Sequence, residues 1–247
     1  MLKDTTSKIT YKQLISLLDQ RRIAFHNLRE KIVIDYPQIS IYKDVRHTMI
    51  LKCVEVLQNT ILGIDHIDKQ VGKSSWWKSD DCPINTTNDD IRNIADSFEM
   101  FIKLAFIHIF FSSIESSFRM LLRSIDPSSC NNATKEFKSI YSALLSKLKL
   151  DYKPLLDILT YLRNTIHNNG VYFPVSNKNV SIRYKGTLYV FKIGKPHEYA
   201  SWPELLIIID DVRVMMEQII YHKQISSLSN VVDPYANWYY KKFGSFV

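Results

Sequence analysis

The sequence predicts a mainly α-helical bundle that carries a small β-hairpin insertion around residues 171–193. The first observation is that apolar residues recur every three or four positions through most of the 247 residues, which is the spacing of one helix face. The second is that only 6 glycines occur, fewer than a fold rich in strands and tight turns usually needs. The third is that the apolar spacing changes to that of strands only after Gly170.

The first two helices are expected within residues 8–33 and 41–69, because each segment carries an apolar stripe with a polar opposite side. Gly63 is expected to weaken the far end of the second helix by roughly 1 kcal/mol relative to alanine. Residues 71–88 then collect Gly, Ser, Pro, Asn and Asp, a composition typical of a loop. The chain is therefore predicted to begin with a pair of helices followed by a long connection.

Residues 90–124 carry the strongest helix signal in the chain. Because this segment is apolar over much of its surface, we expect it in the middle of the bundle. Its most apolar run, FEMFIKLAFIHIFF, contains charged residues and is too short to span a bilayer, so we interpret it as a buried helix without membrane contact. His108 lies among Ile107, Ile109 and Phe110 and is expected to be a core histidine with satisfied hydrogen bonds.

Three further helices complete the predicted bundle, in residues 133–148, 152–167 and 201–225. The first two form a pair joined near Pro154, and Ser201 is a candidate N-cap for the third. Between them, the runs VYFPV and VSIRYKGTLYVFKI have the composition of short strands, with Lys185-Gly186 as the turn of a hairpin.

The predicted domain organisation is an N-terminal helical region in residues 1–88 and a helical bundle with the hairpin insertion in residues 89–247. We expect the two to form one continuous domain, with a split near residues 71–88 as the alternative. The C-terminal segment is expected to dock on the body of the protein because it is rich in aromatic residues, namely Tyr235, Trp238, Tyr239, Tyr240 and Phe243.

Charge and composition narrow the classes of function. The formal net charge of +7 favours nucleic acid, phosphate or an anionic surface as partner, although no block of five or more like charges occurs. The three isolated cysteines, Cys53, Cys82 and Cys130, form no CxxC pair and predict a reducing, cytoplasmic location without a bound metal or cofactor. The N-terminus has no apolar stretch typical of a secretory signal. The motifs of nucleotide hydrolases, dinucleotide enzymes, zinc proteases and serine hydrolases are absent from the sequence.

The most informative stretch is LRNTIHNNG, in which Arg163 and His167 are one helical turn apart and Asn164 follows the arginine. Asn169-Gly170 suits a left-handed helix C-cap, so His167 is expected in the last turn, where the helix dipole favours a protonated imidazole and Arg163 opposes it. A guanidinium binds phosphate oxygens, and an imidazole transfers protons near neutral pH. These are the groups that transphosphorylation of RNA needs. The ribose 2′-OH supplies the nucleophile, so the protein has only to transfer protons and to stabilise negative charge on the phosphate.

The same stretch resembles the HEPN superfamily, helical-bundle proteins of prokaryotic toxin, phage-defence and RNA-processing systems. FSSIESSFRMLL, residues 111–122, is similar to the earlier core helix of that family, which commonly carries a polar or acidic residue facing the motif. The resemblance covers roughly residues 90–225 and implies a metal-independent endoribonuclease. Its site would be composite in a homodimer, with Arg163, Asn164 and His167 as catalytic residues and Glu115 in support.

The spacing of the motif leaves alternatives open. The family usually has four to six residues between arginine and histidine, whereas this chain has three, so the site is either a variant or an inactive one. The chain would then be a non-catalytic HEPN-like module that binds RNA or a partner protein, such as an antitoxin. A structural interpretation is that Arg163 and His167 are only a surface or helix-cap feature. A further alternative is that the protein has an assembly role, in which its N-terminal helices pair with another subunit.

Two further groups of charged residues have a functional and a structural interpretation. Glu115 and Arg119 are spaced for an ion pair within a helix, which is more often structural than catalytic. The hairpin carries basic residues between aromatic ones. This pattern can bind single-stranded nucleic acid by stacking and phosphate contacts. The simpler interpretation, which we favour, is that the aromatic side chains pack inward and the cations protect an exposed strand edge. The candidate RNA-binding residues of the hairpin are Arg183, Lys185, Lys192 and Lys195.

Overall fold

A computed structural model describes residues 9–80, 82–84, 88–130, 136–196, 200–234 and 236. In this part of the chain the fold is mainly helical, with one small antiparallel hairpin, as the sequence predicts. The regular elements are α1 (Tyr11–Asp35), α2 (Val45–His66), a π-helical turn (Ile67–Val71), a 3₁₀ turn (Trp76–Lys78), α3 (Asn88–Ile125), a second 3₁₀ turn (Pro127–Cys130), α4 (Phe137–Leu148), α5 (Lys153–Ile166), β1 (Val180–Tyr184), β2 (Thr187–Phe191), α6 (Trp202–Tyr221) and α7 (Lys223–Ser226).

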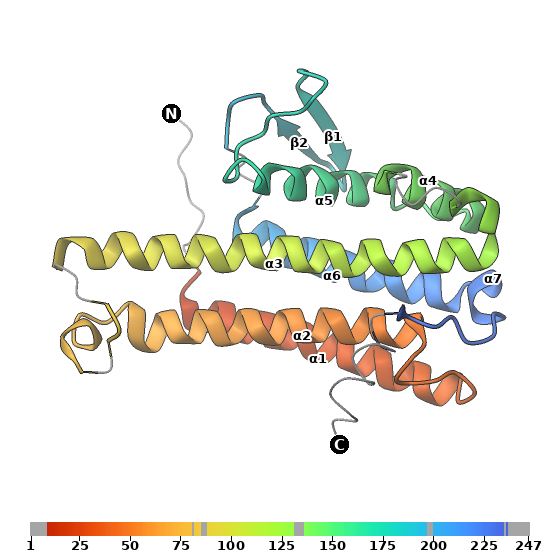
Figure 1. The fold of residues 1–247 in the computed structure, drawn as a ribbon, viewed down its shortest axis with the longest axis horizontal. Coiled ribbons are helices and arrows are strands. Elements are labelled where there is room, and N and C mark those ends of the chain that lie inside the picture. The colour runs from red at the N-terminus through yellow and green to blue at the C-terminus, as the bar shows by residue number, and fades with distance from the viewer. Residues whose placement is uncertain are drawn as a thin grey trace.

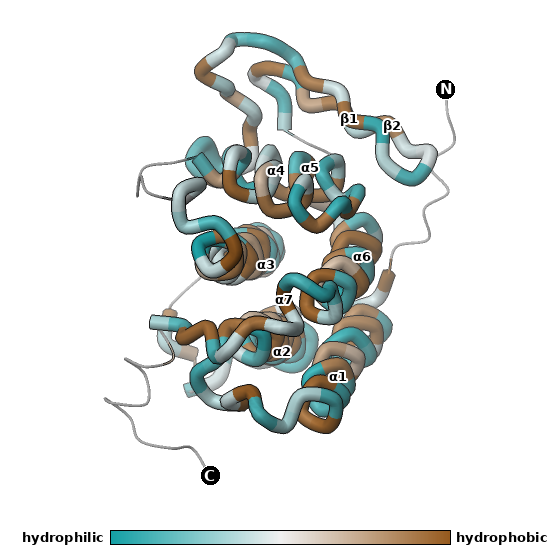
Figure 2. The backbone as a smooth tube through the Cα atoms, turned by 90° about the vertical axis from the view of Figure 1, so that its right-hand side faces the viewer, coloured by the Kyte–Doolittle hydropathy of each residue, from teal (hydrophilic) through white to brown (hydrophobic). Residues whose placement is uncertain are grey.

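The long helices lie along one another and share a single core. Helices α1, α2, α3 and α6 run along the long axis of the molecule, while α4 and α5 cover α3 on one side and the hairpin lies above α5 (Figure 1). The end-on view shows the same helices around a common apolar centre (Figure 2). Buried side chains from α1 and α2 belong to the same hydrophobic cluster as those from α3 to α7. The N-terminal helices therefore pack on the rest of the bundle.

Several helix ends follow from local sequence rules. Thr10 and Gln13 form a capping box at the start of α1, with each side chain bonded to the backbone N–H of the other. The side chain of Ser201 accepts from the backbone N–H of Glu204 at 3.4 Å, so the predicted N-cap of α6 is confirmed. These bonds satisfy backbone donors that have no partner within the helix.

Helices α2 and α3 approach closely where α2 carries Gly63. A Cβ atom built at Gly63 would lie only 2.8 Å from Cδ1 of Ile102 on α3. The glycine was expected only to weaken α2, and the structure adds that its missing side chain leaves room for the Ile102 side chain of α3. Close packing of this kind offsets part of the helix propensity that glycine forfeits.

The hairpin is confirmed, with a narrower extent than expected. Lys185 and Gly186 both have positive φ, 46° and 81°, which is the conformation of a type I′ turn between β1 and β2. The run VYFPV is not a strand, because it contributes only an isolated bridge between Val171 and Pro196. Ile182 pairs with Tyr189, and both are buried.

The start of α2 contains a fully buried ion pair that fixes the C-terminal part of the chain. Asp44 caps α2 and accepts from Nε and Nη2 of Arg46, each at 2.8 Å. The remaining guanidinium N–H groups donate to the backbone carbonyls of Ile225, Leu228 and Ser229. Every donor of Arg46 is thus satisfied, as a buried cation requires.

Residues 231–233, which follow α7, are hydrogen-bonded to the start of α2. The backbone N–H of Val45 donates to Val231, and that of Asp233 donates to Lys43, both at 2.8 Å. Asp233 also accepts from Oγ1 of Thr48 at 2.7 Å and from Nζ of Lys52 at 2.6 Å. The aromatic segment that was expected to dock on the body, Tyr235 and residues 237–247, lies outside the described residues.

One expectation for α3 is wrong, and another stays a prediction. His108 is exposed, not a core histidine, and its neighbour Ile109 is 50% exposed. The predicted helix is correct, but one of its apolar faces is left uncovered by the other described elements. The expectation that α3 avoids a membrane stays a prediction, because Asp90–Ile125 is long and apolar enough to cross one, a test that the core helix of a soluble protein passes equally.

Candidate functional site

The predicted motif lies at the C-terminal end of α5, on the side of the bundle that carries the hairpin (Figure 1). The apolar face of α5 is buried against the core, and Thr165 donates from Oγ1 to the carbonyl of Leu162 at 2.6 Å. Asn169 and Gly170 have φ of 52° and 86°, and the N–H of Gly170 donates to the carbonyl of Thr165. The predicted left-handed cap is therefore confirmed, and it ends the helix at the motif.

Arg163 is half-buried and leans on α3. Its guanidinium carbon lies 5.6 Å from the centre of the Phe111 ring, and Nη1 donates to Oδ1 of Asn164 at 3.3 Å. Its Nε is buried and has no hydrogen-bond partner among the described residues. No carboxylate of the described residues forms an ion pair with Arg163, so its charge is not neutralised within that part of the chain.

His167 has a different environment from Arg163. It is the exposed residue that ends α5, and Asn164 is exposed beside it. The structure brings Arg163 and Asn164 into contact, but among the described residues no hydrogen bond or ring contact joins His167 to Arg163. In one chain, therefore, the imidazole stands in solvent near a guanidinium that rests on an aromatic ring.

Glu115 and Arg119 form the ion pair that their spacing predicts. Oε1 of Glu115 lies 2.5 Å from Nη2 and 3.2 Å from Nε of Arg119, and both side chains are about a quarter exposed. Glu115 is one turn beyond Phe111 on α3, but its carboxylate is engaged by Arg119 and not by Arg163. This arrangement fits the structural interpretation of the pair.

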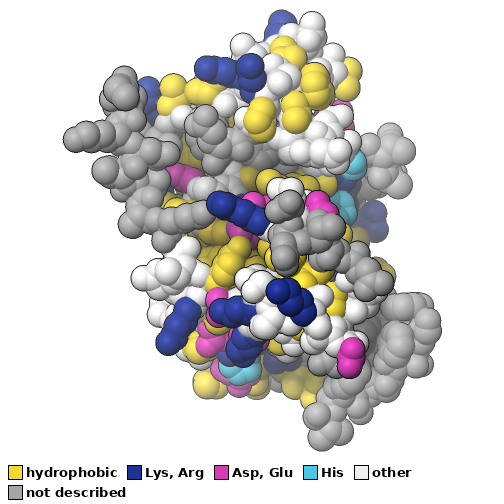
Figure 3. Space-filling model, turned by 90° about the vertical axis from the view of Figure 1, so that its left-hand side faces the viewer, with side chains coloured by type: hydrophobic (Ala, Val, Ile, Leu, Met, Phe, Trp, Pro, Cys, Tyr) yellow, Lys and Arg dark blue, Asp and Glu magenta, His cyan; other side chains and the backbone are white. Residues whose placement is uncertain are grey.

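The two aromatic residues of β2 face inward, whereas Phe173 in the same insertion is 58% exposed. Tyr189 and Phe191 are buried, and Tyr161 and Tyr172 pack against Phe191. The four candidate RNA-binding residues, Arg183, Lys185, Lys192 and Lys195, are exposed. The space-filling view shows basic side chains at the top of the molecule spread singly, not gathered in one patch (Figure 3). Tyr189 and Phe191 thus serve the core, and Phe173 is the aromatic residue of the insertion that is exposed enough to stack on a base.

Lys185 has an additional role in the structure. Its Nζ is paired with Asp211 of α6, whose other carboxylate oxygen accepts from the Tyr184 hydroxyl at 2.9 Å. Burial and this hydrogen bond to a carboxylate raise the pKa of Tyr184. The three residues therefore fasten the tip of the hairpin to α6, which weakens the case for Lys185 as a cation that binds RNA.

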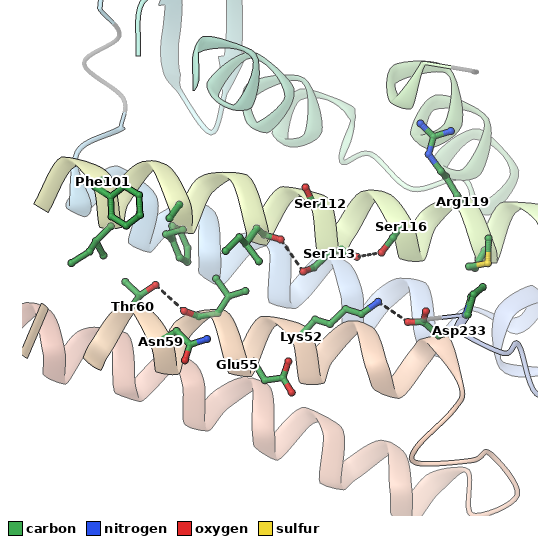
Figure 4. Close-up of a pocket in the computed structure, with 17 residues that line it drawn as sticks. Lys52, Glu55, Asn59, Thr60, Phe101, Ser112, Ser113, Ser116, Arg119 and Asp233 are labelled. Atoms are coloured by element: carbon green, nitrogen blue, oxygen red, sulfur yellow. Dashed lines mark hydrogen bonds and ion pairs between the residues drawn. The ribbon is translucent and has the colours of Figure 1, made fainter. Parts of the chain in front are cut away.

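A groove between α2 and α3 was missed by the analysis of the sequence. It is a cavity of about 730 Å³ with a mostly apolar lining and polar side chains along its length, from Thr60 near Phe101 to Lys52 and Asp233 at the other end (Figure 4). The residues that line it are Lys52, Glu55, Val56, Asn59, Thr60, Phe101, Ile102, Ala105, Phe106, Ile109, Ser112, Ser113, Ser116, Arg119, Met120, Asp233 and Pro234. Arg163, Asn164 and His167 lie elsewhere, on the far side of α3.

The charged side chains Lys52, Glu55 and Asp233 lie near one another in the groove. The Lys52 ammonium is bonded to Asp233, while Arg119 points from α3 away from α2 (Figure 4). Desolvation raises the pKa of Glu55, against the opposing charge of Lys52. Within the described residues, no group of three or more His, Cys, Asp or Glu side chains could hold a metal ion.

Comparison with protein-family models, with curated proteins and with solved structures gives no match to this chain.

Proposed function

We propose that this protein is a metal-independent endoribonuclease of the HEPN-like toxin or phage-defence type, which cleaves RNA with Arg163, Asn164 and His167. The observation that carries the proposal is the state of Arg163. It is a half-buried arginine with no ion-pair partner among the described residues, one turn before an exposed histidine. An uncompensated guanidinium in such a setting favours an anion, and a phosphodiester fits its planar donors.

The chemistry would use groups that the substrate and the protein each supply. The 2′-oxygen of the ribose attacks phosphorus, the bond from phosphorus to the 5′-oxygen breaks, and a 2′,3′-cyclic phosphate and a 5′-hydroxyl end result. Arg163 would bind the non-bridging oxygens, where negative charge increases in the transition state. His167 would accept the proton of the 2′-hydroxyl or donate one to the departing 5′-oxygen.

One imidazole performs one of these two proton transfers at a time. A second copy of the chain would bring a second His167, so that one copy acts as base while the other acts as acid. This gives a physical reason for a site at a dimer cleft, which the resemblance to the HEPN superfamily also implies. The exposure of Asn164 and His167 leaves both accessible to such a partner and to RNA.

A second candidate is a non-catalytic module that binds RNA or a partner protein. It is favoured by the contact of Arg163 with Phe111 and Asn164, which turns the guanidinium towards α3 and leaves it without a contact to His167. In this case the cation would hold a phosphate, but no proton transfer would follow. Binding without cleavage separates the two candidates.

The test is to incubate the full chain with RNA in the presence of a chelator and to analyse the ends of the products. We expect cleavage with cyclic phosphate ends, which His167→Ala abolishes. His108→Ala is the matched control, because His108 is also exposed but lies on α3. Equal cleavage by the unmodified chain and His167→Ala would reject the assignment of His167. Salt-dependent binding with no cleavage by any variant would favour the second candidate.

A further inference from the structure

The groove between α2 and α3 is an apolar surface that the other described elements leave open. Phe101 is 66% exposed and Ile109 is 50% exposed, and both project from the same side of α3 into the groove. In the end-on view no described helix or strand lies over the outer side of α2 and α3 (Figure 2). An exposed apolar concavity of this size usually has an occupant.

The residues at one end of the groove indicate which segment of the chain could occupy it. Asp233 and Pro234 line one end of the groove themselves, and Asp233 is fixed there by Lys52 and Thr48 (Figure 4). The C-terminal segment 235–247 therefore starts at the mouth of the groove. From Met120 to Phe101 the groove extends roughly 29 Å along α3 at about 1.5 Å per residue. Pro234 and Ala236 are helical, and residues 237–247, if extended at about 3.3 Å per residue, are long enough to reach that far.

The composition of the segment complements that of the groove. Its sequence, YANWYYKKFGSFV, has aromatic residues throughout, including Trp238 and Phe243, which would fill the apolar length of the groove. It has two lysines, Lys241 and Lys242, and no acidic residue. The groove offers Glu55, a carboxylate without an ion-pair partner among the described residues.

We propose that the C-terminal segment 235–247 of this chain docks in its own α2–α3 groove, with its aromatic side chains on Phe101 and Ile109 and its lysines towards Glu55. The groove is then an intramolecular binding site for an aromatic, basic peptide. This inference is independent of the proposed ribonuclease activity, because the motif residues of α5 do not line the groove.

The experiment is photo-crosslinking in the full chain. A photoreactive benzoylphenylalanine replaces Phe101 in one variant and Ile109 in another, and the cross-linked peptides are identified by mass spectrometry after illumination. The matched control carries the same residue at position 23, because Ile23 is 43% exposed on α1, outside the groove. We expect cross-links within one chain from positions 101 and 109 to peptides of residues 235–247, and none to that segment from position 23.

A second pair of variants tests the chemistry of the contact. Adding Trp238→Asp and Tyr239→Asp to the position 101 variant should lower the cross-link yield to the level of the control. Glu55→Lys should lower it less, because it removes only the charge attraction. Cross-links that join two chains, cross-links to any other part of the same chain, or a yield that Trp238→Asp and Tyr239→Asp leave unchanged would each overturn the proposal.

Discussion

Arg46 and Arg163 are both removed from open solvent, yet their surroundings are opposite. Arg46 is fully buried, paired with Asp44 and bonded through every N–H to an oxygen of its own chain. Arg163 is half-buried against an aromatic ring, and its Nε has no partner among the described residues. A satisfied buried cation holds a fold together, whereas an unsatisfied one retains affinity for an external anion. The difference separates the structural arginine from the candidate functional one.

Removing the side chain of Arg46 is expected to have the largest effect. Arg46→Ala leaves Asp44 buried without its partner, so the free energy of unfolding should fall by about 3–5 kcal/mol. Urea denaturation followed by circular dichroism measures this change. A loss below roughly 1 kcal/mol, the value of an exposed pair, would show that Arg46 does not anchor the C-terminal segment.

Acid should weaken the same region through His47, which is fully buried next to Arg46. Neither ring nitrogen has a hydrogen-bond partner among the described residues, and burial, followed by the charge of Arg29, lowers the pKa of His47 to about 4. The folded pKa is below the ordinary 6.5, so the stabilisation is complete above pH 6.5 and is lost as the pH falls towards 4. Over this window the free energy of unfolding should drop by roughly 3 kcal/mol.

Denaturation curves at several pH values, recorded for the unmodified chain and for His47→Leu, check this prediction. The substituted chain lacks the titrating group, so its stability should depend less steeply on pH between 6.5 and 4. His26→Leu serves as the control, because His26 is exposed on α1. Identical pH profiles for the unmodified chain and His47→Leu would contradict the assignment.

Substitution of Arg163 should cost little stability and much affinity for an anion. Arg163→Ala removes the contact with Phe111, worth about 1 kcal/mol for a partly exposed cation over a ring. Its RNA affinity should fall and the dependence of binding on salt should become shallower. Thermal melting and filter binding measure the two effects, with Arg123→Ala as a matched control on α3. A loss of stability comparable to that of Arg46→Ala, with unchanged RNA affinity, would make Arg163 structural.

The smallest effect is expected at the ion pair of Glu115 with Arg119. Glu115→Gln removes the charge from a pair that is about a quarter exposed, so stability should fall by less than about 1 kcal/mol. The activity proposed for the motif should remain, because Glu115 is paired with Arg119 and not with Arg163. If cleavage is lost in Glu115→Gln while the melting temperature stays constant, Glu115 takes part in the reaction as the family resemblance implies.

The local features were predictable because they depend on neighbouring residues only. The cap at Asn169-Gly170, the turn at Lys185-Gly186 and the N-cap at Ser201 each follow from the backbone preferences of those residue types. The order of helices and hairpin follows from apolar spacing in the same way.

The features that depend on distant elements were not predictable. Helix α3 is apolar nearly all round, so its sequence does not reveal which side the other helices cover, and the burial of His108 was wrongly expected. The contact of Arg163 with Phe111 and the groove between α2 and α3 need the relative placement of helices far apart in the chain. The candidate motif itself was identified from sequence, but the separation between its arginine and histidine was not.

The bonds between the start of α2 and residues 225–233 have a consequence for synthesis of the protein. The Arg46 charge gains its carbonyl partners only from Ile225, Leu228 and Ser229, and Ile225 leaves the ribosome 179 residues after Arg46. Until then the N-terminal helices would have to leave that ion pair accessible to water, because burying it half-satisfied is costly. We therefore expect that a nascent chain cannot complete this buried ion pair until residues 225–229 have been synthesised.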